Sequence, residues 1–531
     1  MIVVVAKDVV KKYVNGCQVA EEGTAMVGPR SPRLLGEFDQ LVFDTVVPPD
    51  HYLRRVIQCI DFERFRGLMS PRYSPDQGRP SEDSVVMLKL EFLQYHDNLS
   101  DRNVMGRAAT DMAYRLFLGL PLTATLAHPS LLSKFRGRLG SQVHGEIFDD
   151  LVAQARQLGL VKDRLRLKDA THIIANVAIP STLRLLAEVR EKLLSVAEPY
   201  DPLRCEGERV RADVIRQSDE GLSQEDRLVA RVEHLTEILL WADELPPPSD
   251  SDAAWQKLCA ARELAHKVLH DRQNKKDRTV SSQEPDARFG KHGKSFCGFK
   301  LDISMDPDSR ILTSLGVIPA NGDEAANATK LIEHEQDVHG NCVGALSIDS
   351  IGFDGQRLAE WCDPLGLDLD VFVPPKVEPP SDYFVAEDFE EDSEQETVTC
   401  PAGEKSYRRN RNEKDTGWMY RFRRATCASC PLLSRCMKQL PQDKGRTVTK
   451  NDYQAYYDAS RSKAKTEEYQ QVRKQHLAVE RKLWELMVRH GGRRARSRGQ
   501  PRVLLQQLMT GVVVNVKRIV RLLERNDVEI A

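Results

Sequence analysis

Apolar residues in the first third of the chain recur at helical spacing. The clearest run is DSVVMLKLEFLQYH at residues 83–96, whose opening Asp and Ser each offer a cap for the start of a helix. Residues 101–117 and 145–158 show the same spacing, and loops that contain proline separate the runs. The pattern predicts an all-α domain over residues 34–160.

The spacing of the apolar residues changes at residue 165. Residues 165–179 (LRLKDATHIIANVAI) alternate and are rich in β-branched side chains, so we predict a strand that contains Asp169. Helical spacing with many paired charges follows over residues 182–273, which is typical of a solvated helical insertion. Strand patterns then return in FKLDISM at residues 299–305 and in ILTSLGVIP at residues 311–319.

The remaining elements alternate between helix and strand. We predict a helix over residues 324–339, a strand over 343–348 that ends directly at Asp349, a short helix over 356–362, and a strand, LDLDVFVPP, that two prolines stop. After a segment rich in proline, acidic residues and cysteine, two long helices are predicted over residues 466–490 and 503–523.

The order of these elements predicts the fold. Without the two insertions, the order is strand, strand, strand, helix, strand, helix, strand, helix, which is that of a ribonuclease H-like fold. We therefore predict an α/β ribonuclease H-like mixed sheet as the catalytic core, with helical and cysteine-containing insertions and an N-terminal all-α domain. The expected division is a poorly specified segment over residues 1–33, a helical DNA-binding domain over 34–160, the core over 161–181 and 286–376, the helical insertion over 182–285, an acidic linker and cysteine insertion over 377–450, and a catalytic helix with basic C-terminal helices over 451–531.

Composition and charge add information about partners. The 531 residues are 41% hydrophobic and 29% charged with a net charge of −2, but residues 385–396 are strongly acidic and residues 481–525 are rich in Arg and Lys. Local charge clusters, more than net charge, set the affinity for a polyanion. No stretch approaches the roughly 20 uninterrupted apolar residues of a membrane helix, and the opening MIVVVAKDVVKK lacks the charge order of a secretory signal. We expect a cytoplasmic protein without a membrane partner.

Three acidic residues lie where these elements can bring them together. Asp169 lies in the first core strand, Asp349 ends the fourth, and Glu480 lies in the long helix after the cysteine segment. The first and fourth strands are neighbours in a ribonuclease H-like sheet, and a helix across that edge can deliver a third carboxylate. Such oxygen ligands suit two Mg²⁺ or Mn²⁺ ions about 3.5–4 Å apart, which can support an in-line displacement at phosphorus. The alternative is that each acid is an ordinary solvated group.

Four of the eleven cysteines are clustered. Cys400, Cys427, Cys430 and Cys436 can bind one zinc ion as thiolates, and the Cys-x-x-Cys pair has the usual ligand spacing. The alternative is a cluster of buried thiols that stabilises an insertion. No disulfide framework is expected, because the chain carries no export signal.

Several blocks of the sequence resemble bacterial insertion-sequence transposases of the DDE type over roughly residues 34–525. The blocks that carry the resemblance are VVPPDHYLRRV at 46–56, GRPSEDSVVMLKL at 78–90, HPSLLSKFRGRLG at 128–140, PDARFGKHGKSFCGFKLDISMD at 285–306, VIPANGDE at 317–324, CPAG at 400–403, CASCPLLSRC at 427–436, VERKLWELMVRHGGRRARSRG at 479–499 and VVVNVKRI at 512–519. The resemblance implies a metal-dependent DNA endonuclease and strand transferase with Asp169, Asp349 and Glu480 as the triad. It also implies a nucleoid-associated homodimer that acts on terminal inverted repeats and target DNA.

The sequence departs from the family pattern at three positions. The family often has Asp-x-Gly-Tyr at the second acid, whereas this chain has Asp349-Ser-Ile-Gly-Phe, so Asp354 is a rival for that role. His476 stands where related signatures often carry Arg, and Met487 stands where they carry Lys. Two alternatives therefore stay open: a degenerate or domesticated DNA-binding protein, and a nuclease without strand transfer.

Basic residues near the third acid are candidates for DNA contact. The loop GGRRARSRG at residues 491–499 follows the Glu480 helix, and arginine forks match phosphate oxygens in pairs. We expect a flexible loop that tracks a DNA backbone, against the alternative of a solvated basic loop. Trp484 is expected to be core rather than base-stacking. The predicted DNA-binding residues are Arg473, Arg481, Arg489, Arg493, Arg494, Arg496, Arg498 and Lys517, with Arg473 and Arg481 flanking the scissile phosphate.

Overall fold

A computed structural model describes the chain as two compact units, one through Leu139 and one from Gly140. The described residues are 35–74, 81–248, 253–271, 277–376, 382–392, 394–412 and 416–528. The helical run α8 (Ser130–Gln157) crosses the boundary, and its backbone turns at Gly140, which has a φ of 64°. This left-handed conformation favours glycine. The predicted segment over residues 1–33 lies outside the described residues.

The first unit is helical throughout its described residues, which confirms the all-α prediction for the N-terminal region. Its helices are α2 (Glu37–Val46), α3 (Tyr52–Cys59), η1 (Phe62–Arg64), α4 (Phe65–Met69), η2 (Ser70–Arg72), α5 (Ser84–His96), α6 (Asp101–Thr110), α7 (Met112–Leu118) and the start of α8. Phe62 packs edge-on against Phe92 and Phe117, with ring centroids 5.8 and 5.5 Å away. Asp83 caps α5 by accepting hydrogen bonds from the next helical amides.

One prediction in this unit is wrong. Residues 101–117 form two helices, α6 and α7, instead of one. The break lies at Asp111, whose side chain accepts hydrogen bonds from the backbone amides of Ala113 and Tyr114. A carboxylate that satisfies the first amides of a helix starts a new helix at that point.

The second unit contains a mixed six-stranded sheet, as predicted. Its strands are β1 (Arg164–Ile174), β2 (Arg288–His292), β3 (Lys294–Met305), β4 (Leu312–Pro319), β5 (Val343–Ser347) and β6 (Asp370–Phe372). The order is β2-β3-β1-β5-β6, and β4 pairs with β3 on the side away from β1. β1, β3 and β4 are antiparallel, whereas β5 and β6 run parallel to β1. Strand β2 is an addition that the pattern did not predict.

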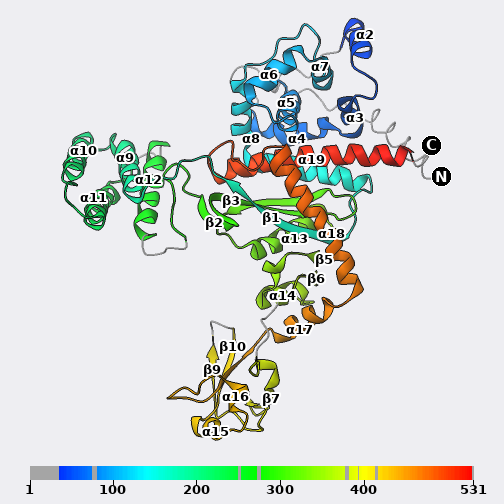
Figure 1. Cartoon of the computed structure of the whole chain (residues 1–531). Helices are drawn as coiled ribbons and strands as arrows, with labels where there is room; N and C mark the ends of the chain where they lie inside the picture. The colour runs from blue at the N-terminus through cyan, green and yellow to red at the C-terminus, as the bar shows by residue number, and fades with distance from the viewer. Residues whose placement is uncertain are drawn as a thin grey trace. The chain divides into compact units, whose positions relative to one another are not determined.

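Helices cover both faces of this sheet (Figure 1). α13 (Glu324–His339) packs on β3, β4 and β5 on one face, while α19 (Gln500–Val528) packs on β4 from the other. α18 (Glu467–Trp484) crosses β1, β5 and β6 and continues as the π-helix η5 (Glu485–Arg489). α14 (Gly355–Cys362) and α17 (Gln454–Lys463) pack on each other next to β6.

α19 is the core helix of this unit. It is long and apolar enough to cross a membrane, contrary to the expectation that no segment would be, but 83% of its most apolar window is buried inside the protein. A Cβ at Gly511 would lie 2.9 Å from the Leu315 side chain and 3.0 Å from that of Phe148. The glycine therefore permits the close packing of α19 on the sheet.

Two insertions interrupt the sheet in sequence. The first forms the helices α9 (Thr182–Ala197), α10 (Pro202–Gln217), α11 (Gln224–Glu244) and α12 (Ala253–His270), which enclose an apolar core of their own (Figure 1). The second contains η4 (Ala386–Asp388), β7 (Glu390–Asp392), β8 (Thr397–Thr399), β9 (Arg408–Asn412), β10 (Gly417–Arg421), α15 (Arg424–Ala428), α16 (Leu433–Cys436) and β11 (Thr447–Asn451). The strands of the second insertion were not predicted, because its charged and cysteine-rich sequence shows no apolar alternation.

Candidate active site

The register of two parallel strands brings Asp169 and Asp349 to the same edge of the sheet. Leu167 on β1 pairs with Ser347 on β5. Each acid lies two residues beyond its strand's member of this pair, so both side chains continue on the same face. Asp349 lies two residues after the end of β5 and accepts a hydrogen bond from the Ile351 amide at 3.3 Å. The paired ends of β1 and β5 therefore hold the two carboxylates beside each other.

Burial and mutual repulsion perturb both acids. The pKa of Asp169 is raised to about 7, mainly by burial and further by the charge of Asp349, although the Ala170 amide donates to it at 2.7 Å. Burial and the charge of Glu324 raise the pKa of Asp349. The charge of Lys168 acts to lower both pKa values and that of Arg473 acts to lower the pKa of Asp349, but neither offsets burial, so an added cation would favour the charged carboxylates.

Helix α18 adds Arg473 and Glu480 to this edge. The Arg473 guanidinium donates to the Ile348 carbonyl at 2.8 Å and to the Ser347 hydroxyl at 3.2 Å. Burial lowers the pKa of Arg473, while the charges of Asp349, Asp169 and Glu480 all act to raise it. One guanidinium therefore lies within electrostatic range of all three acids, which come from β1, the end of β5 and α18.

The three carboxylates are not drawn together into a tight cluster. Within the described ranges, groups of three or more side chains whose ligand atoms all lie within 4.8 Å do not include Asp169, Asp349 and Glu480. Glu480 is exposed on α18, two turns after Arg473. Asp169 and Asp349 are partly buried, so the three acids differ in their exposure.

The residues at which the sequence departs from the family pattern have clear local roles. Asp354 is exposed and caps α14 by accepting a hydrogen bond from the Arg357 amide at 3.2 Å. His476 is buried, its Nδ1 lies 3.1 Å from the Ser347 hydroxyl, and burial lowers its pKa to about 3. Met487 is buried in η5. Of the two rival acids, Asp349 is thus the one beside Asp169.

Sequence reasoning missed two charged residues near the acids. Lys168 is 1% exposed, lies 2.9 Å from the Asp302 carboxylate and donates to the Glu324 carbonyl at 2.8 Å. The Glu324 side chain forms an ion pair with Lys300 at 2.6 Å. Glu324 begins α13, where an acidic residue is common, so nothing in the sequence alone separated it from an ordinary helix end.

The basic loop after η5 is held in place by hydrogen bonds, so the expectation of a flexible loop is wrong. Arg493 and Ala495 exchange backbone hydrogen bonds with Ile174 at the end of β1. From α19, the Gln506 side chain donates to the Gly491 and Arg494 carbonyls, and the Gln507 side chain donates to the Gly492 carbonyl. Two glutamines and a strand end therefore fix the path of a segment whose composition suggested mobility.

Some of the predicted DNA-binding side chains already form hydrogen bonds within the protein. Arg473 does so as described, Arg493 bonds Thr171 and His172, Arg498 bonds Asn176 and Gln283, and Lys517 bonds Glu485. Arg481, Arg489 and Arg494 are exposed, Arg498 is exposed despite its hydrogen bonds, and Arg496 is half-buried. Trp484 is 52% exposed, so its predicted place in the core is wrong, and the Arg489 guanidinium lies 5.6 Å from its ring centre.

The four clustered cysteines line one small cavity. Cys400, Cys427, Cys430 and Cys436 surround a space of about 30 Å³. The Arg446 amide donates to the Cys427 sulfur at 3.4 Å, and a Cβ at Gly445 would lie 2.9 Å from that sulfur. The thiol donors are of the kind that zinc prefers, but no three of these sulfurs lie within 4.8 Å of one another among the described residues.

Comparisons with known proteins match both ends of the chain. Residues 41–138 match the model of a transposase domain (DUF772), and residues 399–520 match that of a transposase DDE domain. The second match includes the cysteines, Glu480 and the basic loop. No curated protein and no solved structure matches the chain. The two matches, with the helical first unit and the mixed sheet, support an insertion-sequence DDE transposase.

Proposed function

We propose that this transposase cleaves the ends of its insertion sequence and joins the freed strands to target DNA, with Asp169, Asp349 and Glu480 as the catalytic triad. The observation that carries the proposal is the pair of acids two residues beyond the paired Leu167 and Ser347, both with raised pKa values. The DDE domain match supports a nuclease of this class. The strand order β4-β3-β1-β5-β6, antiparallel then parallel, supports a ribonuclease H-like core.

The three carboxylates would hold two Mg²⁺ or Mn²⁺ ions. Hard oxygen donors fit these ions, and burial, which raises the pKa of Asp169, makes an added cation favourable beside it. When bound, the ions activate the attacking oxygen and stabilise the leaving oxygen at phosphorus. Asp169 on β1 and Asp349, two residues after β5, would hold the ions, and Glu480 would complete the ligand set from α18. Arg473, fixed to the Ile348 carbonyl, positions the end of β5.

The chemistry would proceed in two displacements. In the first, water attacks phosphorus at the transposon end and the 3′-oxygen leaves with a proton, which yields a 3′-hydroxyl and a 5′-phosphate. In the second, that hydroxyl loses its proton, attacks a phosphorus of target DNA and releases the target 3′-oxygen. An Asp169 carboxyl with a pKa of about 7 gives up its proton near neutral pH, which makes both of its oxygens available as ligands.

DNA would follow the exposed face near Glu480. Arg481, Arg489 and Arg494 are exposed there and can contact phosphates. Trp484, one helical turn after Glu480, offers an exposed ring for base stacking. We further propose that the helical first unit reads the terminal inverted repeats, that a homodimer pairs two ends, and that the protein acts at the nucleoid in the cytoplasm. The four cysteines would hold one structural zinc ion.

The test is metal-dependent nicking and joining of a DNA that carries the ends of the element. We expect Asp169→Asn to lower the rate of Mg²⁺-dependent nicking at least a thousandfold, because the triad acts as a unit. Asp354→Asn is the matched control, since it changes the rival acid, which caps α14, and it should retain nicking within a few-fold.

Equal activity of Asp169→Asn and the unmodified chain would remove the triad assignment. The products separate the alternatives. Covalent donor–target joints identify a transposase, nicking without joints identifies a nuclease, and DNA binding without nicking identifies a degenerate relative.

A further inference from the structure

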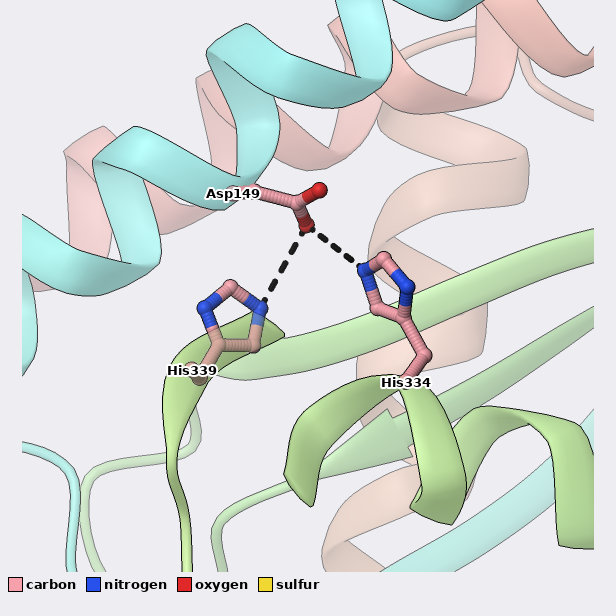
Figure 2. Close-up of side chains that lie close together, drawn as sticks. All are labelled: Asp149, His334 and His339. Atoms are coloured by element: carbon pink, nitrogen blue, oxygen red, sulfur yellow. Dashed lines mark hydrogen bonds and ion pairs between the residues drawn. The ribbon is translucent and has the colours of Figure 1, made fainter. Parts of the chain in front are cut away.

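Two histidines and one aspartate converge at the end of α13 that lies away from the catalytic acids. The Nε2 atoms of His334 and His339 lie 3.0 and 3.3 Å from the same carboxylate oxygen of Asp149, and Figure 2 shows both rings directed at it. The two rings stand nearly perpendicular, with centroids 5.7 Å apart. One potential ligand atom from each residue lies within 4.8 Å of the other two.

Hydrogen bonding alone does not satisfy this cluster. The His339 side chain is 1% exposed, and its Nε2, although 3.3 Å from the carboxylate, makes no hydrogen bond of good geometry with a described residue. A buried ring nitrogen without a partner carries a desolvation cost. Protonation of both rings would place two cations side by side in a partly buried position. A metal ion instead accepts the lone pairs of both nitrogens and of the carboxylate at once.

The charges around the cluster favour a cation. Glu335 and Asp337, which flank His334 on α13, both act on it with negative charge. His334 is 39% exposed and Asp149 is 18% exposed, so an ion has a path from solvent. At about 1.5 Å per residue, α13 separates Glu324, beside the catalytic acids, from His339 by about 22 Å. The cluster is therefore separate from the catalytic acids.

We propose that Asp149, His334 and His339 form a second metal site that binds a divalent transition-metal ion, Zn²⁺ best among the common ions. Imidazole nitrogens with one carboxylate suit Zn²⁺ and its neighbours better than Mg²⁺, and three protein ligands leave a fourth position for water. The ion would tie α8 to the end of α13. Because Glu335 in the same helical turn is bonded to β1, the site would brace α8 against the sheet. This role does not depend on the proposed nuclease activity.

The test counts zinc bound to the full-length chain after chelation, reloading with Zn²⁺ and dialysis in millimolar Mg²⁺. The variants share a Cys427→Ser/Cys430→Ser background, which removes the thiol donors. The matched control is His266→Gln, because His266 pairs with Asp243 at 2.7 Å in the helical insertion. We expect His334→Gln to lose one zinc per chain and His266→Gln to lose none. Equal zinc content in the two variants would overturn the proposal.

A second measurement needs no substitution and covers the case in which a variant fails to fold. X-ray absorption of zinc in the unmodified chain should show imidazole nitrogens at about 2.0–2.1 Å together with sulfur at about 2.3 Å. A spectrum with sulfur ligands alone, or without imidazole scattering, would overturn the proposal. Zn²⁺ should also raise the melting temperature of His266→Gln and not that of His334→Gln, and an equal shift in both would contradict the site.

Discussion

The two faces of strand β1 differ in whether their charged side chains have ion-pair partners. On the face that α13 covers, Arg166 and Lys168 are almost fully buried, and each has a carboxylate partner, Glu335 at 2.6 Å and Asp302 at 2.9 Å. On the face that α18 crosses, Asp169 accepts a backbone hydrogen bond from Ala170 but forms no ion pair with any described residue. Neighbouring residues of one strand thus lie in a compensated and an uncompensated environment.

This difference indicates that one face of β1 has a structural role and the other a ligand-binding role. A buried ion pair gives little net stability but is costly to break, so the pair of Arg166 and Glu335 fixes how α13 packs on the sheet. A buried carboxylate without a partner responds by raising its pKa, and it gains most from an added cation. The face with ion pairs therefore fixes α13 on the sheet, while the face that carries Asp169 would be stabilised by a ligand with positive charge.

The largest effect on stability is expected from breaking the compensated face. Glu335→Ala would leave the Arg166 guanidinium buried without its partner and would remove the acceptor for the hydroxyls of Ser304 and Thr313. We expect the free energy of unfolding in urea to fall by about 3–5 kcal/mol. The control Glu333→Ala changes an exposed residue of the same helix and should stay within about 0.5 kcal/mol of the unmodified chain. Equal losses would contradict the assignment.

Removing the uncompensated charge should have the opposite sign. The pKa of Asp169 is about 7 in the folded protein, against 3.8 for an ordinary Asp side chain. The free energy of unfolding therefore falls as pH rises from about 4 to 7. Asp169→Asn should therefore stabilise the metal-free protein at pH 8 by up to about 4 kcal/mol and have little effect at pH 4. Urea unfolding at both pH values measures this. Destabilisation at pH 8 would show that the carboxylate is already compensated.

Local patterns predicted the elements that carry the acids. The spacing of apolar residues and the cap at Asp323 define α13, and its observed bounds, Glu324–His339, are those expected. The strand that ends at Asp349 was also predicted, because a β-branched apolar run and a following turn are local features. Elements whose pattern spans only a few neighbouring residues can be predicted from one sequence.

Features that depend on distant partners could not be predicted. Asp149 meets His334 across 185 positions of the chain, and no local spacing marks that contact. The path of the basic loop is set by Gln506 on α19, and the exposure of Trp484 is set by how α18 crosses the sheet. A helical pattern tells which residues share a face but not which neighbour covers it. The site near β1 depends on tertiary packing for the same reason.

The affinity of the Asp169 site for Mn²⁺ should depend on pH. Because Asp169 must lose a proton before it can ligate with both oxygens, the apparent affinity for Mn²⁺ should fall by nearly tenfold per pH unit well below about 7. This amounts to roughly fiftyfold between pH 7 and pH 5. Titration calorimetry in two buffers would also detect the released proton. Asp354→Asn should show the same slope, and an affinity that does not change with pH would contradict the raised pKa.

The smallest effect concerns His476, the neutral group beside Arg473 on the uncompensated face. Burial lowers its pKa to about 3 in the folded protein, against 6.5 for an ordinary His side chain. As pH falls, the unfolded chain therefore binds a proton before the folded protein does. Stability from this residue is full above about 6.5 and is lower by about 1.4 kcal/mol at pH 5.5. His476→Gln keeps a polar side chain near Ser347 and should remove this loss. The comparison is best made in the metal-free Asp169→Asn background, because Asp169 shifts stability in the opposite direction over the same pH range. If the two chains lose equal stability between pH 8 and 5.5, His476 is already protonated in the folded state, and the face beside Asp169 holds more positive charge than its contacts indicate.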